Sequence, residues 1–283
     1  MIERFERNDH EIIWGDAIDI LLNIVPDNSI DLIFADPPYN IGKNFNGNKE
    51  NKSEKEYLEW CYTWLNLCVR KLKITGSFYV MASTQSMPYF DIYLRDRIQV
   101  VSRIIWYYDS SGVQARNHYG SLYEPILYCV KDENRHTFNS NKILVEAKTG
   151  SKRKLIDYRK SIPAQYNTFK VPGNVWEFPR VRYRMDEYEN HPTQKPIALL
   201  ERIILASSNP GDLILDPFSG TFTTSFVAKK TGRKSIGIEI EEEYIKIGLR
   251  RLEILCSYKG TKLERELRSF EIKNKPYKQL KFD

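Results

Sequence analysis

Two short apolar runs, 180 residues apart (216 − 36), each end in an aspartate that is followed at once by proline. The first run, 30–35, precedes Asp36, and the second, 213–215, precedes Asp216. Apolar runs of this kind alternate along the chain with segments of helical spacing, which is typical of an α/β fold with a mostly parallel sheet. Because an open parallel sheet presents its chemistry at the carboxyl ends of its strands, both aspartates are candidate site residues.

Apolar periodicity predicts the elements of this fold along most of the chain. The predicted strands are 11–14, 29–35, 76–81, 102–108, 124–130, 213–215 and 235–239, and the predicted helices are 17–24, 56–73, 197–208, 223–230 and 241–255. Residues 43–55 are polar and are expected to form a mobile loop. Periodicity is lost from 112 to 190, which indicates an inserted recognition region, and 258–283 is interpreted as a basic C-terminal tail.

Composition is that of an ordinary soluble domain, with 41% hydrophobic and 28% charged residues among 283. No signal peptide and no membrane helix is apparent, so a cytoplasmic location is expected. The four cysteines are scattered without a CxxC pair, and the four histidines form no cluster with them. The sequence therefore predicts no metal site.

Positive charge is concentrated in one part of the predicted recognition region. The chain carries a net charge of +6, and between Glu146 and Arg184 ten basic residues face three acidic ones, interleaved with aromatic residues and prolines. A basic, aromatic-bearing, irregular segment is a candidate nucleic-acid surface. Charge alone leaves a solvated loop region equally open.

The motif Asp36-Pro37-Pro38-Tyr39 has the groups needed to activate an exocyclic amino group. The lone pair of such an amine is delocalised into the base ring, and two acceptors on its N–H bonds would free that lone pair toward an electrophile. Asp36 would supply a carboxylate and Pro37 a carbonyl that the two prolines hold in place. Tyr39 offers a flat face for a base to stack on, and the base would have to be flipped out of a duplex. A plain strand-to-loop turn is the alternative.

The second motif is interpreted as a cofactor site. Gly220 would let the backbone approach a ligand closely, and Glu239, at the end of the next strand, is placed to bind the hydroxyls of a ribose. Position 222 is Phe, so no phosphate-binding glycine loop is evident, which favours a nucleoside cofactor without phosphates. Asp16 is as consistent with a simple turn as with a cofactor contact, and Lys195 alone would be a solvated charge.

These motifs together resemble the β-class amino DNA methyltransferases that are specific for adenine. The resemblance rests on DPPY at 36–39, HPTQKP at 191–196, DPFSG at 216–220 and GIEI at 237–240, in that order. One subgroup of this class also resembles the chain at 110–115, 157–160, 170–183 and 185–196. The family usually has DPFxGxGT, and Phe222 here stands at the second glycine, which puts the shape of the methionine-end pocket in question.

The resemblance implies a Rossmann-like S-adenosylmethionine-dependent methyltransferase fold, with a circularly permuted mixed sheet and an embedded target-recognition region. It divides the chain into a catalytic part (1–111), the recognition region (112–190), a cofactor-binding part (191–257) and the tail (258–283). It implies S-adenosyl-L-methionine as cofactor, double-stranded DNA as partner, a homodimer, and transfer to N6 of a flipped adenine over which the loop after DPPY closes.

The same resemblance, joined to the charge pattern, assigns the candidate residues. The catalytic set is Asp36, Pro37, Pro38 and Tyr39; the cofactor contacts are Asp16, Asp36, Lys195, Asp216, Phe218, Gly220 and Glu239; and the DNA contacts are Lys43, Lys152, Arg153, Lys154, Arg159, Lys160, Arg180 and Arg182.

Other activities stay open on the sequence. The same two hydrogen-bond acceptors, Asp36 and the Pro37 carbonyl, would also fit the N4 amino group of cytosine. Methylation of RNA or of a protein glutamine is a further alternative. A non-catalytic DNA-binding module is another alternative, and it would not bind the cofactor. An endonuclease is disfavoured because the sequence shows no acidic cluster of the nuclease type. The recognition sequence, and whether the enzyme accompanies a restriction nuclease or acts alone, does not follow from motif spacing.

Overall fold

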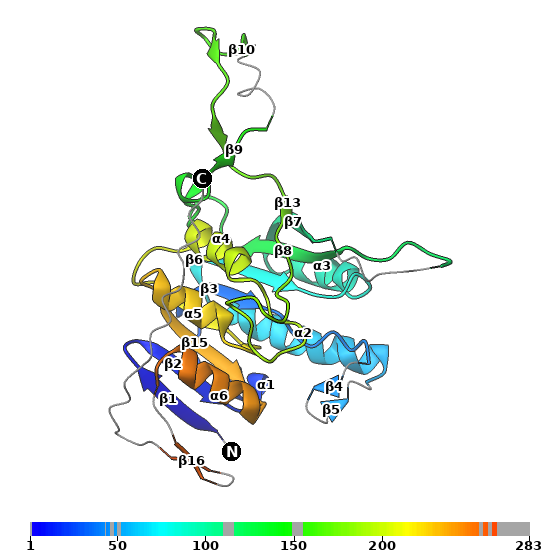
Figure 1. Cartoon of the computed structure of the whole chain (residues 1–283), viewed down its shortest axis with the longest axis vertical. Helices are drawn as coiled ribbons and strands as arrows, with labels where there is room; N and C mark the ends of the chain where they lie inside the picture. The colour runs from blue at the N-terminus through cyan, green and yellow to red at the C-terminus, as the bar shows by residue number, and fades with distance from the viewer. Residues whose placement is uncertain are drawn as a thin grey trace.

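The computed structural model describes residues 2–42, 52–109, 116–148 and 155–254, with the backbone of 44–45, 48–49, 257–259 and 262–264. The strands of its central sheet are β1 (Glu3–Arg7), β2 (His10–Trp14), β3 (Ile30–Ala35), β6 (Leu72–Met81), β7 (Gln99–Tyr107), β8 (Tyr123–Val130), β13 (Val175–Glu177), β14 (Leu213–Asp216) and β15 (Lys234–Glu239). They lie in the order β1-β2-β15-β14-β3-β6-β8-β7-β13 (Figure 1). The five strands from β2 to β6 are parallel, whereas β1 and β8 run antiparallel to their neighbours, so the predicted mixed α/β sheet is confirmed.

Helices cover both faces of this sheet (Figure 1). They are α1 (Ala17–Asn23), α2 (Glu54–Lys71), α3 (Met87–Arg95), α4 (Ile197–Ser207), α5 (Thr223–Lys230) and α6 (Glu242–Arg251). One core contains buried residues of α1, α2 and α3, and the opposite face packs against α4, α5 and α6. The parallel strands are thus buried on both sides, which explains why they read as continuous apolar runs.

The helix α2 begins at a capping box, two residues before the start at 56 that the periodicity predicts. The Ser53 hydroxyl accepts a hydrogen bond from the Glu56 backbone N–H, and the Glu56 carboxylate accepts one from the Ser53 N–H at 2.9 Å. Cys61 and Cys68 are both buried on this helix, as their seven-residue spacing predicts. The elements that were not predicted include the two edge strands of the sheet, β1, in which only Phe5 is buried, and β13, as well as the helix α3.

Two strands of the segment 112–190 belong to the central sheet, namely β8 and β13. The rest is built from η1 (Ser140–Lys142), β9 (Val145–Glu146), β10 (Ile156–Asp157), β11 (Ala164–Gln165) and β12 (Phe169–Lys170). In Figure 1 the part that carries β9 and β10 extends as an arm away from the sheet. The remaining strands pair as hairpins: β4 (Asn44–Phe45) with β5 (Asn48–Lys49), and β16 (Ser257–Lys259) with β17 (Lys262–Glu264). None of the helices in the described part of the chain is long and apolar enough to span a membrane.

Candidate active site

Four neighbouring parallel strands bring the predicted carboxylates to one edge of the sheet. β14 pairs with β3, so the ends that carry Asp216 and Asp36 are adjacent although 180 residues (216 − 36) separate them in sequence. β15 and β2 follow on the other side of β14, and they place Glu239 and Asp16 beside this pair. All four residues line a cavity of about 780 Å³. This register brings the two aspartates that the sequence singled out to one cavity.

Glu239 is held by three backbone N–H groups. Its Oε2 accepts a hydrogen bond from the N–H of Gly220 at 2.8 Å, and its Oε1 accepts from the N–H groups of Ile240 and Glu241 at 2.8 and 2.9 Å. Burial nevertheless raises the pKa of Glu239 to about 7, an effect that these hydrogen bonds only partly oppose. A buried carboxylate with this pKa favours a ligand that brings hydroxyl donors or positive charge.

Asp216 is equally buried and equally perturbed. It accepts hydrogen bonds from the Phe218 N–H at 3.0 Å and from the Thr224 hydroxyl at 2.5 Å. Burial raises the pKa of Asp216 to about 7, and the nearby charges of Asp36 and Glu239 add to the rise. The ring of Phe218 packs on Trp60 and Trp64, with ring centroids 5.6 and 5.0 Å apart, so an aromatic wall adjoins the carboxylates.

Gly220 and Asp16 complete this half of the cavity. Gly220 has a φ of +49°, and a Cβ atom there would lie 3.3 Å from the ring of His191, so the position suits glycine. Asp16 caps α1 by accepting hydrogen bonds from the Ile18 and Asp19 N–H groups, both with Oδ1. The structure therefore supports both of the roles that the sequence left open for Asp16, because the same residue also lines the cavity.

The two raised pKa values give a pH dependence of cofactor binding. Ionised Asp216 and Glu239 attract a positively charged ligand, so the affinity for S-adenosylmethionine should rise with pH between about 5 and 7, by up to about tenfold per pH unit for each group. The stability of the free protein has the opposite pH dependence. Carboxyls with raised pKa values bind protons on folding, so their contribution to the free energy of unfolding is lost as the pH rises toward 7. Calorimetric titration from pH 5 to 8 measures the first effect, and a pH-independent affinity would contradict it.

The Asp36-Pro37-Pro38-Tyr39 turn leaves β3 and enters the same cavity. The Tyr39 hydroxyl lies 2.8 Å from Asp36 Oδ1, and the Tyr57 hydroxyl of α2 donates to the Pro38 carbonyl at 2.9 Å. Among the described residues, no donor bonds the Pro37 carbonyl, the acceptor that the sequence assigned to an amino group. The turn is thus fixed from two sides while that carbonyl is left available.

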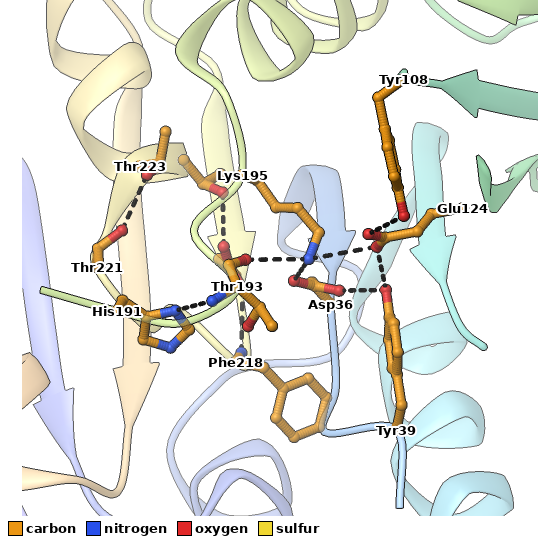
Figure 2. A network of polar contacts seen from close by, with 12 residues as sticks. Asp36, Tyr39, Tyr108, Glu124, His191, Thr193, Lys195, Phe218, Thr221 and Thr223 are labelled. Atoms are coloured by element: carbon orange, nitrogen blue, oxygen red, sulfur yellow. Dashed lines mark hydrogen bonds and ion pairs between the residues drawn. The ribbon is translucent and has the colours of Figure 1, made fainter. Parts of the chain in front are cut away.

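Lys195 lies against Asp36. Its Nζ is 2.5 Å from Asp36 Oδ2 and 3.5 Å from Glu124 Oε2, and it donates to the Thr193 carbonyl at 3.2 Å (Figure 2). Burial lowers the pKa of Lys195, but the two carboxylates more than offset this, so its pKa lies above the ordinary value. Burial likewise raises the pKa of Asp36, and Lys195 counteracts the rise only in part.

Glu124 is a site residue that the sequence did not reveal. It comes from β8, its side chain is only 16% exposed, and it contacts Tyr39, Tyr108 and Lys195 (Figure 2). Its one signal in the sequence is a carboxylate in an otherwise apolar strand, Tyr123–Val130. That signal does not reveal that β8 lies beside β6, which is what brings Glu124 to the site.

The candidate DNA contacts lie in two places. Arg159 and Lys160 are on the arm, where Arg159 pairs with Asp157, whereas the guanidinium of Arg180 lies 5.0 Å from the ring of Tyr108 next to the cavity. Arg182 donates to the Asp109 carbonyl at 3.2 Å. The other four candidates, Lys43, Lys152, Arg153 and Lys154, lie outside the described residues.

Phe222 is a core residue and does not line the cavity. Its φ of +57° is one that glycine adopts easily, which fits the position where the family usually has glycine. Its fully buried ring packs over Gly237 and Gly248, and a Cβ atom on either glycine would come within 2.7 Å of it. The aromatic ring is therefore accommodated by glycines on β15 and α6 and is not part of the cavity lining.

Replacing this ring should destabilise the protein. Phe222→Ala is expected to lower the free energy of unfolding by about 3–5 kcal/mol, the usual cost of truncating a buried phenylalanine. Urea denaturation measures this, with Phe169→Ala as control because Phe169 is 57% exposed on the arm. Equal stability of the two variants would show that the Phe222 ring is not part of the core.

A Rossmann-like sheet with a DPPY turn beside two buried carboxylates, Asp216 and Glu239, is typical of the S-adenosylmethionine-dependent amino-methyltransferases. The family model described as "DNA methylase", which covers N6 and N4 enzymes, matches residues 30–250. The chain belongs to this family and is a DNA methyltransferase.

Individual relatives agree with this assignment. The chain is 61% identical to the DNA adenine methyltransferase YhdJ of Escherichia coli (strain K12), over 92% of this chain and 88% of YhdJ, which confirms the subgroup that the sequence predicted. It is 39% identical to the type II methyltransferase M.HpaI of Haemophilus parainfluenzae, over 87% of this chain and 74% of that one. Among solved structures, the cytosine-N4-specific PvuII DNA methyltransferase superposes with a TM-score of 0.66 at 20% identity, over 86% of each chain. A complex of M1.HpyAVI with S-adenosylmethionine gives 0.59 at 26% identity, over 85% of this chain and 98% of the other.

Proposed function

We propose that this protein transfers a methyl group from S-adenosyl-L-methionine to N6 of an adenine flipped out of double-stranded DNA. The observation that carries the proposal is one cavity in which the Asp36 carboxylate adjoins the two buried carboxylates Asp216 and Glu239. The first suits an amino group, and the other two suit a nucleoside with hydroxyls and positive charge.

The residues present fit the cofactor. Glu239 would accept hydrogen bonds from the ribose hydroxyls, and Gly220, which has a φ of +49° and no side chain, would let the backbone approach the ligand. Asp16 and Asp216 would add negative charge and Phe218 an apolar wall, whereas the ammonium of Lys195, which the sequence assigned to the cofactor, pairs with Asp36 and Glu124. When bound, S-adenosylmethionine supplies a methyl group on a sulfonium, a strong electrophile that needs no covalent enzyme intermediate.

Asp36, Pro37, Pro38 and Tyr39 prepare the nucleophile. Asp36 accepts one N–H of the amino group and the Pro37 carbonyl accepts the other, which localises the nitrogen lone pair toward the methyl donor. Pro38 fixes the backbone through its hydrogen bond from Tyr57, and Tyr39 stacks on the base. After transfer the amine carries an extra proton, and the Asp36 carboxylate is placed to accept it.

The arm and the loop after DPPY would contact the DNA. Arg159, Lys160, Arg180 and Arg182 are proposed as phosphate contacts, as are Lys43, Lys152, Arg153 and Lys154. Ile41 and Lys52 line the cavity, and the Asn40 side chain bonds the Lys52 backbone, so the two ends of the loop that is proposed to close over the base lie at the pocket.

Neutralising the arm should reduce the salt dependence of DNA binding. Arg159→Gln and Lys160→Gln are each expected to lower the slope of log K against log salt concentration by about one, the value for one lost phosphate contact. Fluorescence anisotropy at several salt concentrations measures the slope. Lys234→Gln is the control, since Lys234 begins β15 and lies at the end of that strand opposite the cavity. Unchanged slopes would remove the arm from the interface.

Transfer to N4 of cytosine is the alternative, because Asp36 and Pro37 would hold that amino group in the same way. The likeness to YhdJ, named as an adenine enzyme, favours adenine, whereas the likeness to the PvuII enzyme at 20% identity concerns the fold alone. Methylation-sensitive sequencing of DNA exposed to the protein distinguishes the two and also gives the sequence context.

We further propose that the protein is a homodimer and is located in the cytoplasm. The support is the resemblance to the β class. Light scattering over a range of concentrations tests the dimer, and a monomer at all of them would contradict it.

A further inference from the structure

Both oxygens of Asp36 are occupied by groups of the chain itself. Oδ1 is bonded by the Tyr39 hydroxyl at 2.8 Å, and Oδ2 is paired with the Lys195 ammonium at 2.5 Å. An amino group therefore cannot bind this carboxylate in the same positions until one of the two donors moves away. Figure 2 shows the lysine nitrogen beside the Asp36 carboxylate, the group that the proposed reaction assigns to the amine.

Removing Lys195 from Asp36 has a physical consequence. The lysine side chain is only 7% exposed, so its charge cannot simply return to water. A buried ammonium that loses its anion is strongly destabilised unless another carboxylate holds it. The Thr193 carbonyl accepts one of its N–H bonds but brings no net charge.

Glu124 is in position to hold it. Its Oε2 lies 3.5 Å from Lys195 Nζ and 2.9 Å from the Tyr39 hydroxyl, so it contacts both donors that occupy Asp36. Its Oε1 accepts from the Tyr108 hydroxyl at 3.3 Å, and Tyr108 in turn lies under Arg180. Glu124 belongs to β8, a strand outside every motif, and Tyr39 and Lys195 separate it from the cavity that they line.

The charge state of Glu124 fits this position. Burial raises its pKa, but Lys195 and the hydroxyl of Tyr39 more than offset the rise, with further help from Arg180 and Tyr108. The pKa of Glu124 therefore lies below the ordinary value, and the side chain is a carboxylate at neutral pH. In the same cluster burial raises the pKa of Asp36, and the charge of Glu124 adds to that rise.

We propose that Glu124 is the positioning residue of the active site, which takes over the Lys195 ammonium and the Tyr39 hydroxyl when the target amino group binds Asp36. Lys195 stands in for the amine in the free enzyme and moves toward Glu124 as the base enters. No covalent bond changes in this step: one N–H···O contact of Asp36 is exchanged for another. The inference rests on the proposed function, because it concerns the amine that Asp36 receives.

Glu124→Gln tests the role, since glutamine keeps the shape but removes the charge that would hold Lys195. The kcat should fall at least about tenfold, the effect of losing one charge-assisted hydrogen bond, while the Kd for S-adenosylmethionine stays within about twofold. The acidic limb of the kcat profile should move to lower pH, because the charge that raises the pKa of Asp36 is gone. Glu124→Asp should recover part of the rate. Glu177→Gln, an exposed glutamate at the sheet edge, is the matched control.

A double-mutant cycle separates positioning from mere structural support. If Glu124 acts by holding Lys195, the effect of Glu124→Gln should largely vanish in a Lys195→Met background. An equal loss of rate in both backgrounds, or a Glu124→Gln variant with unchanged kcat and pH profile, would overturn the inference. The proposed function is tested separately, by identifying the base that the wild type methylates. Lys195 pairs with Asp36 in the free enzyme whichever base enters. The ratio of the kcat values of Glu124→Gln and the wild type therefore tests the inference for adenine and for cytosine alike.

Discussion

Asp36→Ala should abolish methyl transfer while leaving cofactor binding largely intact. Asp36 is the carboxylate of the DPPY turn, and its loss removes both the proposed acceptor for the amine N–H and the proposed acceptor for the departing proton. Removing one such group from an active site typically costs about 10²–10³ in kcat, and the loss of two functions places the expected decrease at or above about 10³-fold. Glu239 and Asp216 remain in place to bind the methyl donor.

The measurement is the rate of labelled methyl incorporation into DNA, with calorimetric titration of S-adenosylmethionine as the second readout. Asp96→Ala controls for loss of an aspartate, because Asp96 is exposed at the end of α3. Asp36→Asn keeps the shape and should be nearly as inactive, since an amide cannot take up the proton. Turnover of Asp36→Ala within tenfold of the wild type would falsify the assigned role.

Glu239→Gln should weaken cofactor binding but have little effect on the rate of the transfer step. The glutamine can keep the acceptor for the Gly220 N–H but loses the negative charge, and a charged hydrogen bond contributes about 1.5–3 kcal/mol. The expected rise in Kd for S-adenosylmethionine is therefore about 10- to 100-fold. It should be largest near pH 8, where the wild-type residue is ionised, and smaller below its pKa of about 7.

Calorimetric titration at pH 6 and pH 8 gives this comparison directly. Glu241→Gln is a close control, since Glu241 also lines the cavity and follows Glu239 in the chain, but no motif assigns it to the ribose. At saturating cofactor the kcat of Glu239→Gln should return toward the wild-type value. A Kd unchanged at both pH values would mean that Glu239 is not a cofactor residue.

The convergence of Asp16, Asp36, Asp216 and Glu239 could be predicted because it follows from local signals. Each residue ends a short apolar run, and runs of this kind become parallel strands whose carboxyl ends share one edge. The order of the strands was a different matter. The resemblance implied a permuted sheet, but that β3 lies directly beside β14 was not predicted, because motif spacing does not give strand order.

Contacts between distant segments could not be predicted. Glu124 reaches the site because β8 packs antiparallel to β6, and no motif surrounds it. Lys195 was assigned to the cofactor, yet in this structure its ammonium lies between two carboxylates. The ring of Phe222 left the pocket shape in question until its packing on Gly237 and Gly248 was known, because tertiary packing decides where a side chain points.

The central claim is that one cavity holds a methyl donor at Asp216 and Glu239 and an adenine amino group at Asp36. Mass spectrometry of nucleosides tests it most directly, after DNA has been incubated with the protein and S-adenosylmethionine carrying a deuterated methyl group. The account predicts deuterated N6-methyladenine, formed by the wild type and missing with Asp36→Ala. Deuterated N4-methylcytosine in its place, or no labelled base at all, would contradict the account.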